Sequence, residues 1–372
     1  MATNASSLVN FGTTGPAVGE FIYAIGPRSA PSFLPANSYV NRYLVSAYPA
    51  LGALIVPVIT PVSYTATART LPSSQQWTSV VYGNGVFVAV SSSASSVAAT
   101  SPDGITWTAR TLPSAASWTS VTFGNGVFVA VAQGPSTTAA TSPDGITWTA
   151  RTLPSSSNWM SITYGNGLFV AISNTSGTTA ASSPDGITWT ARTLPATALW
   201  KYVIYGNGRF VAVAESSSTA GVSYDGVTWA AGTMPSASVW NSIAYGNGIF
   251  VATIGGATTS CASSTDGFNW TTRTLPSSAT WYSVTYGNNS FLTTAYGAAS
   301  AATSPDGTTW TARTMPSAVN WYSVTFGTGK FVAVSIGPST SAATIDYAIN
   351  ATDFVIPVIS PITGTTAYVK AT

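Results

Sequence analysis

The sequence predicts an all-β fold: a seven-bladed β-propeller made of four-stranded antiparallel blades. The first observation is a repeat of seven tryptophans at intervals of 41, 41, 41, 40, 41 and 40 residues: Trp77, Trp118, Trp159, Trp200, Trp240, Trp281 and Trp321. The other six tryptophans follow at a second repeat position: Trp107, Trp148, Trp189, Trp229, Trp270 and Trp310. A period in the forties indicates an array of similar units, and four short strands per unit of this length are typical of a propeller.

Turn motifs divide each unit into strand-like runs. After Trp118, a run rich in β-branched and aromatic residues breaks at Gly124-Asn125-Gly126 and resumes at Val127. Asn-Gly between two such runs predicts a hairpin, because both turn residues tolerate positive φ. A second break, at Pro143-Asp144-Gly145, separates two further runs. No helical periodicity occurs in the array, so helical repeats are excluded.

The number of turns predicts seven blades and a closed ring. Seven turns of the first kind are centred on Asn84, Asn125, Asn166, Asn207, Asn247, Asn288 and Thr328. Six Asp-Gly turns follow, at Asp103, Asp144, Asp185, Asp225, Asp266 and Asp306. The seventh unit lacks one, whereas residues 64–72 match the segment that ends the other units. We therefore expect residues 64–72 to pair with the last blade, which would remove exposed sheet edges.

The repeat divides the chain into three parts. Residues 1–63 form an N-terminal attachment segment, residues 64–345 the propeller, and residues 346–372 a C-terminal segment. Residues 55–62 match residues 355–362 in sequence. We therefore expect the C-terminal segment to pair with the N-terminal segment or to lie beside it. The prolines in both segments suit edge strands.

Composition excludes several classes of function. Charged residues make up 6% of the chain, against roughly 25% in ordinary soluble proteins, and histidine is absent. A net charge of +2 provides no electrostatic surface for nucleic acid. The N-terminus has no signal-peptide pattern, and the apolar stretch at residues 51–62 is too short to span a bilayer. We expect a protein made in the cytoplasm without a signal peptide and without membrane insertion.

The charged residues that do occur are explained as scaffold. Each of the six turn aspartates is expected to cap its own turn. Of the other carboxylates, only Glu215 lies well inside the array, whereas a glycosidase needs two facing carboxylates. Six arginines follow at one repeat position and suggest a bridge to the turn aspartate or stacking: Arg69, Arg110, Arg151, Arg192, Arg273 and Arg313. We predict no catalysis, no cofactor and no metal site, since each turn offers only one carboxylate.

A candidate recognition surface lies opposite the turns. The loops between second and third strands differ among units, and so does the residue after each first-strand tryptophan. Variation on one rim of a repeated scaffold favours binding, although drift at exposed positions explains it equally well. The candidate ligand-binding residues are Lys201, Asn241, Tyr282, Tyr322 and Glu215. Tyr282 and Tyr322 could form an aromatic platform for a sugar ring, with Lys201 and Asn241 as hydrogen-bond donors.

Two sequence patterns carry a family resemblance. The Ser-Pro-Asp-Gly-Ile-Thr-Trp segments resemble the Asp-box of sialidase-like propellers, with one residue fewer. The fuller pattern, W-x-S-V-x-Y-G-N-G-x-F-V-A-V followed by S-P-D-G-x-T-W-T, is similar to repeats of bacteriophage tail and fibre proteins. It covers residues 64–344.

The resemblance implies a non-enzymatic virion protein, such as a tail fibre or another component that projects from the particle. Its terminal segments would bind other virion proteins, and the protein would be a homo-oligomer on the particle. Its propeller would present a face for a host-surface glycan or receptor. The alternatives are a purely structural decoration protein and a sialidase-like glycosidase, which the sparse charges oppose.

Overall fold

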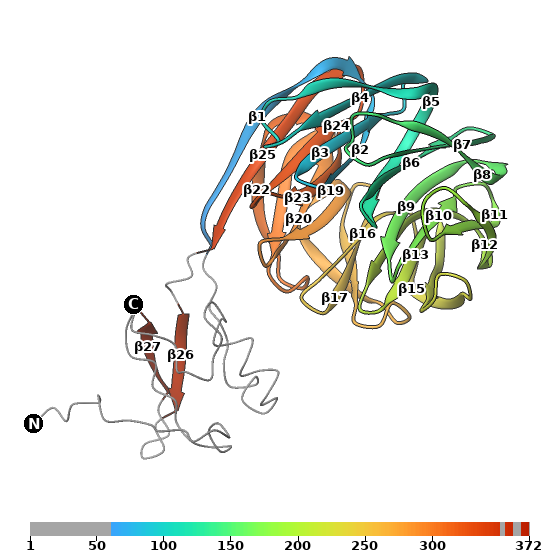
Figure 1. Ribbon diagram of the computed structural model, residues 1–372. Helices are drawn as coiled ribbons and strands as arrows, with labels where there is room; N and C mark the ends of the chain where they lie inside the picture. The colour runs from blue at the N-terminus through green and yellow to red at the C-terminus, as the bar shows by residue number, and fades with distance from the viewer. Residues whose placement is uncertain (1–60, 350–353, 360–365, 372) are drawn as a thin grey trace, which may run out of the picture. The chain divides into compact units, whose positions relative to one another are not determined.

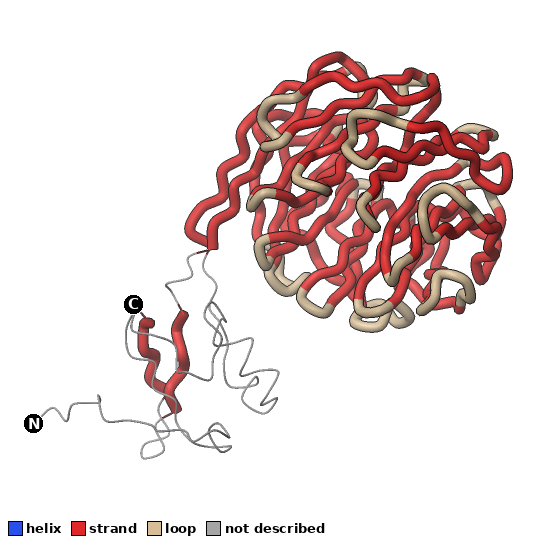
Figure 2. Tube along the Cα trace, in the orientation of Figure 1, coloured by secondary structure: helices blue, strands red, loops and turns tan. Residues whose placement is uncertain are grey.

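The computed structural model describes residues 61–349, 354–359 and 366–371, and within these ranges it contains strands and turns but no helix (Figures 1 and 2). Accordingly, no helix of the described residues could span a membrane. The chain divides into two units, of which Tyr64–Tyr347 is one and the two ends of the chain make up the other. Residues 1–60, including most of the expected N-terminal attachment segment, lie outside the described residues.

The strands of Tyr64–Tyr347 follow the sequence repeat, which we number 1 to 7 by the tryptophans from Trp77 to Trp321. The second strands are β3 (Val86–Ser91), β6 (Val127–Gln133), β10 (Leu168–Ser173), β13 (Arg209–Glu215), β17 (Ile249–Ile254), β20 (Ser290–Tyr296) and β24 (Lys330–Ser335). The third strands are β4 (Ser95–Ser101), β7 (Ser136–Ser142), β11 (Gly177–Ser183), β14 (Ser217–Ser223), β18 (Thr258–Ser264), β21 (Ala298–Ser304) and β25 (Ser339–Ile349).

The remaining strands begin or end the repeats. Separate first strands are β2 (Trp77–Gly83), β9 (Trp159–Gly165), β16 (Trp240–Gly246) and β23 (Trp321–Gly327). Outer strands that end at a break are β1 (Pro61–Gln75), β8 (Thr149–Ser157), β15 (Ala230–Ser238) and β22 (Thr311–Val319). Three 17-residue strands are the fourth strand of one repeat and the first strand of the next: β5 (Thr108–Gly124), β12 (Thr190–Gly206) and β19 (Thr271–Gly287).

These strands form antiparallel sheets in a propeller-like arrangement (Figure 1). Three sheets have seven strands, because each long strand joins two successive repeats; one of them has the order β2-β3-β4-β5-β6-β7-β8. A four-stranded sheet has the order β1-β25-β24-β23, so the strand that contains residues 64–72 lies next to the third strand of repeat 7. Neighbouring strands are thus close in sequence everywhere except at β1.

The first hairpin of each repeat turns through residues with positive φ. Asn125 has φ 48° and Gly126 has φ 77°, and the same pair of signs recurs in the other repeats. This is the backbone that the Asn-Gly motif predicts, and it matches the right-handed twist of the flanking strands. Thr328 has the same conformation, φ 48°, although threonine rarely adopts it.

The two kinds of turn lie at the same end of the array and join successive repeats. The side-chain amide of Asn84 donates to the carbonyl of Pro143, 3.2 Å away, in the Asp-Gly turn of the next repeat. Asn125, Asn207, Asn247 and Asn288 donate to the corresponding stretch of their own next repeats. We call this the turn end.

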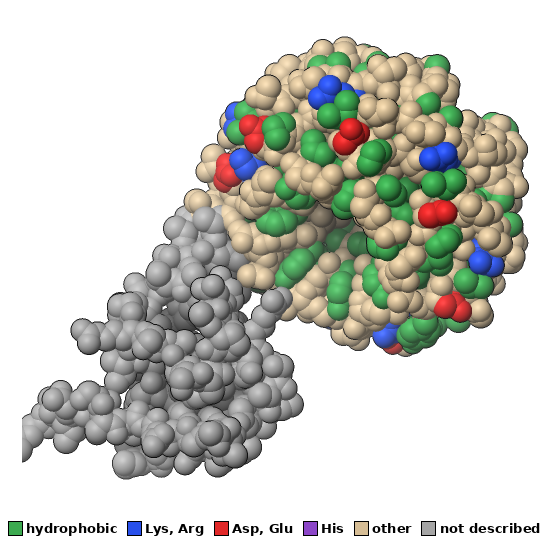
Figure 3. Space-filling model, in the orientation of Figure 1, with side chains coloured by type: hydrophobic (Ala, Val, Ile, Leu, Met, Phe, Trp, Pro, Cys, Tyr) green, Lys and Arg blue, Asp and Glu red, His purple; other side chains and the backbone are tan. Residues whose placement is uncertain are grey.

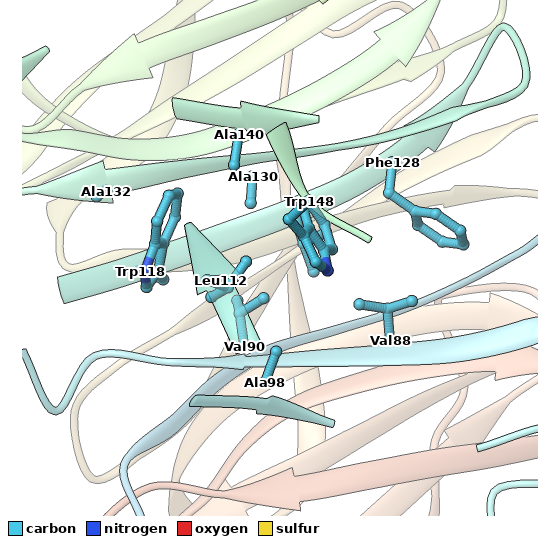
Figure 4. Packing of buried hydrophobic residues seen from close by; sticks show 11 residues of the cluster. Val88, Val90, Ala98, Leu112, Trp118, Phe128, Ala130, Ala132, Ala140 and Trp148 are labelled. Carbon is cyan, nitrogen blue, oxygen red and sulfur yellow. The ribbon is translucent and has the colours of Figure 1, made fainter. Parts of the chain in front are cut away.

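The core lies between successive repeats. Every first-strand tryptophan is at most 1% exposed, and Phe87, Phe128, Phe169, Phe210, Phe250, Phe291 and Phe331 are fully buried. Figure 4 shows one cluster, in which Trp118, Phe128 and Trp148 of repeat 2 pack with Val88 and Val90 of repeat 1. Burying each aromatic side chain contributes roughly 1.5–3 kcal/mol, so these interfaces hold the repeats in series.

Of the two roles suggested for the repeated arginines, the bridge to the turn aspartates is wrong, whereas Arg313 lies over the rings of Tyr64 and Tyr347. Arg110 Nε instead donates to the hydroxyl of Thr100 on the neighbouring third strand, at 2.9 Å, and the five other arginines do the same in their repeats. The only ion pair among the described residues joins Lys201 to Glu215. The strand register explains the difference, because Arg110 pairs with Ala98, well away from the turn at Asp103.

At the C-terminal end of the chain, β26 (Phe354–Ile359) pairs with β27 (Thr366–Ala371) in an antiparallel two-stranded sheet. The expected pairing of the C-terminal segment with the N-terminal segment involves residues 55–60, outside the described residues, and stays a prediction.

Candidate functional site

Each first strand contains a β-bulge directly after its tryptophan. In repeat 4, Trp200 pairs with Ala214 and Tyr202 pairs with Val213, so Lys201 is an extra residue without a partner opposite. The same register shift occurs in the six other repeats. A bulge releases one residue from the strand ladder and re-aims its side chain. The seven bulge residues are Thr78, Thr119, Met160, Lys201, Asn241, Tyr282 and Tyr322.

All seven bulge residues line one opening, which we call the mouth. The mouth has a cavity volume of about 40 Å³, whereas enclosed ligand pockets typically measure roughly 300–1,000 Å³. It is therefore a small site that does not enclose a whole ligand. The structure brings the predicted ligand-binding residues Lys201, Asn241, Tyr282 and Tyr322 together with Thr78, Thr119 and Met160, which belong to the same variable sequence position.

A ring of serines, the serine belt, lies directly below the mouth. Ser79 Oγ accepts a hydrogen bond from the backbone N–H of Val121 in the next repeat, at 3.1 Å. Equivalent bonds are accepted by Ser120, Ser161, Ser242, Ser283 and Ser323. Ser323 accepts from Val80, so the belt also connects repeat 7 with repeat 1.

Tyr202 occupies the belt position in repeat 4. It lines both the mouth and a second cavity of about 210 Å³, which continues between the first strands. Tyr202 therefore stands at the boundary between the two spaces, where a bulky side chain replaces serine.

Lys201 and Glu215 form an ion pair at the mouth. The Nζ–Oε1 distance is 2.6 Å, and the two side chains are 13% and 23% exposed. Glu215 ends β13 and lies opposite Leu199, beside the bulge that carries Lys201. Glu215 therefore neutralises Lys201, which is the only cation that lines the mouth in the described part of the chain.

Three tyrosines form an aromatic cluster on the same side of the mouth. The ring centroids of Tyr282 and Tyr322 are 4.3 Å apart with an interplanar angle of 33°, and Tyr296 lies 5.6 Å from Tyr282. Burial, followed by the proximity of Tyr322 and then of Glu215, raises the pKa of Tyr282 above its ordinary value. Tyr282 therefore remains a neutral phenol. Tyr296 is the most open of the three, at 39% exposure.

Other residues at the mouth are buried or make their hydrogen bonds within the fold. Thr78 Oγ1 donates toward the carbonyls of Val90 and of Trp118 in the next repeat. Asn241, expected to be an exposed hydrogen-bond donor, is only 5% exposed. A Cβ added to Gly255 would lie 1.9 Å from Nδ2 of Asn241. The absence of a side chain at Gly255 therefore leaves room for the Asn241 side chain.

One sequence signal for these pairs is an offset of 14 residues. Lys201 pairs with Glu215, Asn241 packs on Gly255 and Tyr282 packs on Tyr296, each at this separation. Sequence reasoning missed Tyr296, because residues on either side of a hairpin were not compared position by position. The offset follows from the constant length of the first hairpin.

The turn aspartates serve their own turns. Asp103 Oδ1 accepts from the backbone N–H groups of Ile105 and Thr106 and from the Ser101 hydroxyl. These hydrogen bonds lower the pKa of Asp103, and the bond from Ile105 has the largest effect. For Asp266, burial opposes the shift, but hydrogen bonds from Asn269, Phe268 and Ser264 outweigh it and lower the pKa to about 2. No cluster of three metal-ligating His, Cys, Asp or Glu side chains occurs in the described residues.

Comparison with known proteins supports a β-propeller. Residues 62–191 and 111–239 each match the model of the DUF6242 beta propeller domain. No curated protein matches the chain.

Solved structures of similar fold include both enzymes and other proteins. Virginiamycin B lyase from Staphylococcus aureus is 13% identical, with a TM-score of 0.68 over 76% of this chain and 99% of that chain. YCF48 from Cyanidioschyzon merolae is 15% identical, with a TM-score of 0.60 over 76% and 98%. The WD40 beta propeller domain of Doa1 is 13% identical, with a TM-score of 0.57 over 77% and 97%. At these identities the likeness concerns the fold alone.

Proposed function

We propose that this chain is a non-enzymatic recognition protein of a bacteriophage particle, in which the mouth of a seven-bladed propeller binds a host-surface glycan. One observation carries the binding proposal. The seven bulge residues differ among otherwise similar repeats, and all seven line one opening. Variable side chains gathered on a rigid repeated scaffold are typical of a recognition site.

The proposed ring has seven blades, and residues 64–72 close it on the last blade. Three contacts support this closure: β1 lies next to β25, Arg69 Nε donates to Thr344 Oγ1 at 3.0 Å, and Val80 N–H donates to Ser323 Oγ. Leu71 also packs in a cluster with residues of repeats 1 and 7. Deletion of residues 64–72 should lower the thermal unfolding midpoint, and an unchanged midpoint would argue against closure.

The chemistry of the mouth supports binding without catalysis. Glu215 is the only carboxylate near the mouth in the described chain, and Lys201 holds it at 2.6 Å. A glycosidase needs two carboxylates across the scissile bond, and a neutral Tyr282 is a poor nucleophile. The likeness to a lyase carries little weight: a form inactivated by replacement of one histidine has the same fold, and this chain contains no histidine.

The virion context rests on the sequence resemblance to phage tail and fibre repeats. The sparse, scattered charge fits a surface that depends on hydroxyl groups (Figure 3). In this proposal the terminal segments, including the matching residues 55–62 and 355–362, bind other virion proteins, and several copies assemble on the particle. Proteomics of purified particles should detect the chain; its absence from them would contradict the assignment.

Binding is tested with the full chain on glycan arrays and on host cells. Tyr296→Ser removes the exposed ring and introduces the residue found at the equivalent position 92, so binding should fall while the fold is retained. Tyr224→Ser is the matched control, because Tyr224 is 59% exposed and lies at the turn end. If both variants lost glycan binding equally, the mouth would not be the glycan-binding site.

Two further outcomes separate the alternatives. No binding to any glycan or cell, with incorporation into particles retained, would favour a decoration protein. Hydrolysis of a sialoside that Glu215→Gln abolishes would instead indicate a glycosidase. Deletion of residues 1–60 should prevent incorporation into particles while glycan binding is retained.

A further inference from the structure

The charge at the mouth is internally balanced. Of the described residues that line it, Lys201 alone carries a charge, and the others are threonine, serine, methionine, asparagine and tyrosine. Glu215 neutralises Lys201 at 2.6 Å. Arg209, the other cation of repeat 4, is committed elsewhere, because its Nη1 donates to the carbonyl of Asp266 at the turn end.

A charged ligand would have to break this balance. An anion bound to Lys201 would displace Glu215 and leave a carboxylate that is 23% exposed without its partner, beside neutral Tyr282. A cation bound to Glu215 would displace Lys201, which is only 13% exposed. A partly buried charge that loses its partner is costly. The ion pair therefore disfavours ligands of either sign.

The aromatic cluster next to the pair suits the apolar face of an uncharged ring. The rings of Tyr282 and Tyr322 pack against each other in a tilted arrangement, and Tyr296 extends the cluster toward solvent. A pyranose presents C–H groups on one face and hydroxyls at its edge, so it can lie on a tyrosine and hydrogen-bond to the neighbouring polar groups. The cavity of about 40 Å³ is too small to take in more than part of one ring.

We infer that the mouth binds the terminal residue of a neutral glycan, with the Lys201–Glu215 pair excluding sialylated, sulfated and other acidic forms. This inference rests on the proposed glycan-binding function and adds the class of sugar. Lys201 and Glu215 are then specificity-determining residues, because they reject charge. The tyrosines supply the contact surface.

The test is a glycan array on which each oligosaccharide is present in a neutral and an acidic form, probed with the full chain. We expect the neutral members to bind and their acidic partners not to bind. Calorimetry with the best neutral glycan at about 50 and about 500 mM NaCl should give affinities within about twofold, since no ligand charge is screened. Stronger binding of acidic members, lost as salt rises, would overturn the inference while leaving glycan binding intact.

Glu215→Gln tests the role of the ion pair. Glutamine stands at the equivalent position 133 in repeat 2, so the scaffold accommodates it. The variant leaves Lys201 without its partner and should gain about tenfold or more in affinity for acidic glycans such as sialyllactose. No gain would show that the pair does not set specificity.

The matched control is Asp346→Asn, which changes the net charge equally at an exposed position outside the mouth. It should bind the wild-type set of neutral glycans and no acidic ones. If Asp346→Asn gained as much affinity for acidic glycans as Glu215→Gln, the overall charge would be the cause, and the inference would also be overturned. Absence of binding by every form of the protein would reject the proposed function itself, and the inference with it.

Discussion

The turn end and the mouth of the repeat array use the same supersecondary unit in opposite ways. At the turn end, repeats 1 to 6 present the same asparagine and aspartate. Asn84, for example, joins the next repeat and Asp103 holds its own turn. At the mouth, the residue at one position changes from threonine to methionine, lysine, asparagine and tyrosine. The difference shows where the scaffold needs side chains and where it does not.

The scaffold at the mouth depends on other positions. The bulge residue is released from the strand ladder, and the serine belt supplies side-chain hydrogen bonds between repeats that do not involve it. Thr78 and Thr119 add a bond to the tryptophan carbonyl of the next repeat. Substitution at the bulge therefore leaves the serine-belt hydrogen bonds between repeats intact. The sequence can vary there without loss of the fold, which is the condition for a recognition site on a repeat protein.

The largest expected effect is on the core that both ends share. Trp118→Ala removes a fully buried indole between repeats 1 and 2. Truncation of a buried tryptophan costs about 3–5 kcal/mol, so the free energy of unfolding should fall by that amount. Urea denaturation followed by fluorescence and circular dichroism measures it. A loss below about 1 kcal/mol would mean that the interface between repeats does not control stability.

The turn end should be sensitive to side-chain identity and to acid. Asp144→Ala removes the acceptor for the N–H groups of Ile146 and Thr147, at a cost of about 1 kcal/mol, similar to loss of a capping side chain. Hydrogen bonds, of which the bond from Thr147 has the largest effect, lower the pKa of Asp144 in the folded state. The stabilisation of the fold by the Asp144 carboxylate is therefore fully present above the unfolded pKa. It is lost as pH falls through the folded pKa.

The check is urea denaturation of wild type and Asp144→Ala at neutral pH and at successively lower pH. The difference between the two should shrink as pH falls below the usual aspartate range, because hydrogen bonding lowers the pKa of Asp144 in the folded state. A difference independent of pH would show that the carboxylate charge does not contribute.

A smaller effect is expected at the pair formed by Asn241 and Gly255. Gly255→Ala places a Cβ against the Asn241 amide and should turn this side chain away, at a cost of about 1 kcal/mol or less, since only the end of a polar side chain has to move. Asn241→Ala in the same chain should remove that cost. A double-mutant cycle measures the coupling, and additive effects would contradict the contact.

The smallest effect is expected at the bulge itself. Met160→Thr introduces the residue that repeats 1 and 2 carry at this position, and the free energy of unfolding should change by no more than about 0.5 kcal/mol. A thermal melt beside that of Trp118→Ala makes the comparison direct. A loss of stability as large as that of Trp118→Ala would mean that the bulge residue is needed for the stability of the fold.

The candidate site was only partly predictable. The position of Tyr282 and Tyr322 directly after a tryptophan predicts their place at the mouth, and in the structure their rings pack against each other. The same reasoning gave Asn241 too much exposure, since nothing local shows that Gly255 makes room for its side chain. Tyr296 was not among the predicted residues. Of the two roles suggested for the repeated arginines, the strand register does not allow the bridge to the turn aspartates, whereas Arg313 does stack, over Tyr64 and Tyr347.

The sequence by itself determined the strands, the turns and the buried aromatic residues, because each follows from local alternation or from a turn residue that tolerates positive φ. Only the tertiary structure decided that seven separate bulge residues meet at one opening, and that Lys201 and Glu215 neutralise each other there. A bulge changes the direction of a side chain without changing the residue pattern, and the arrangement of the repeats joins positions that are up to 244 residues apart, from Thr78 to Tyr322.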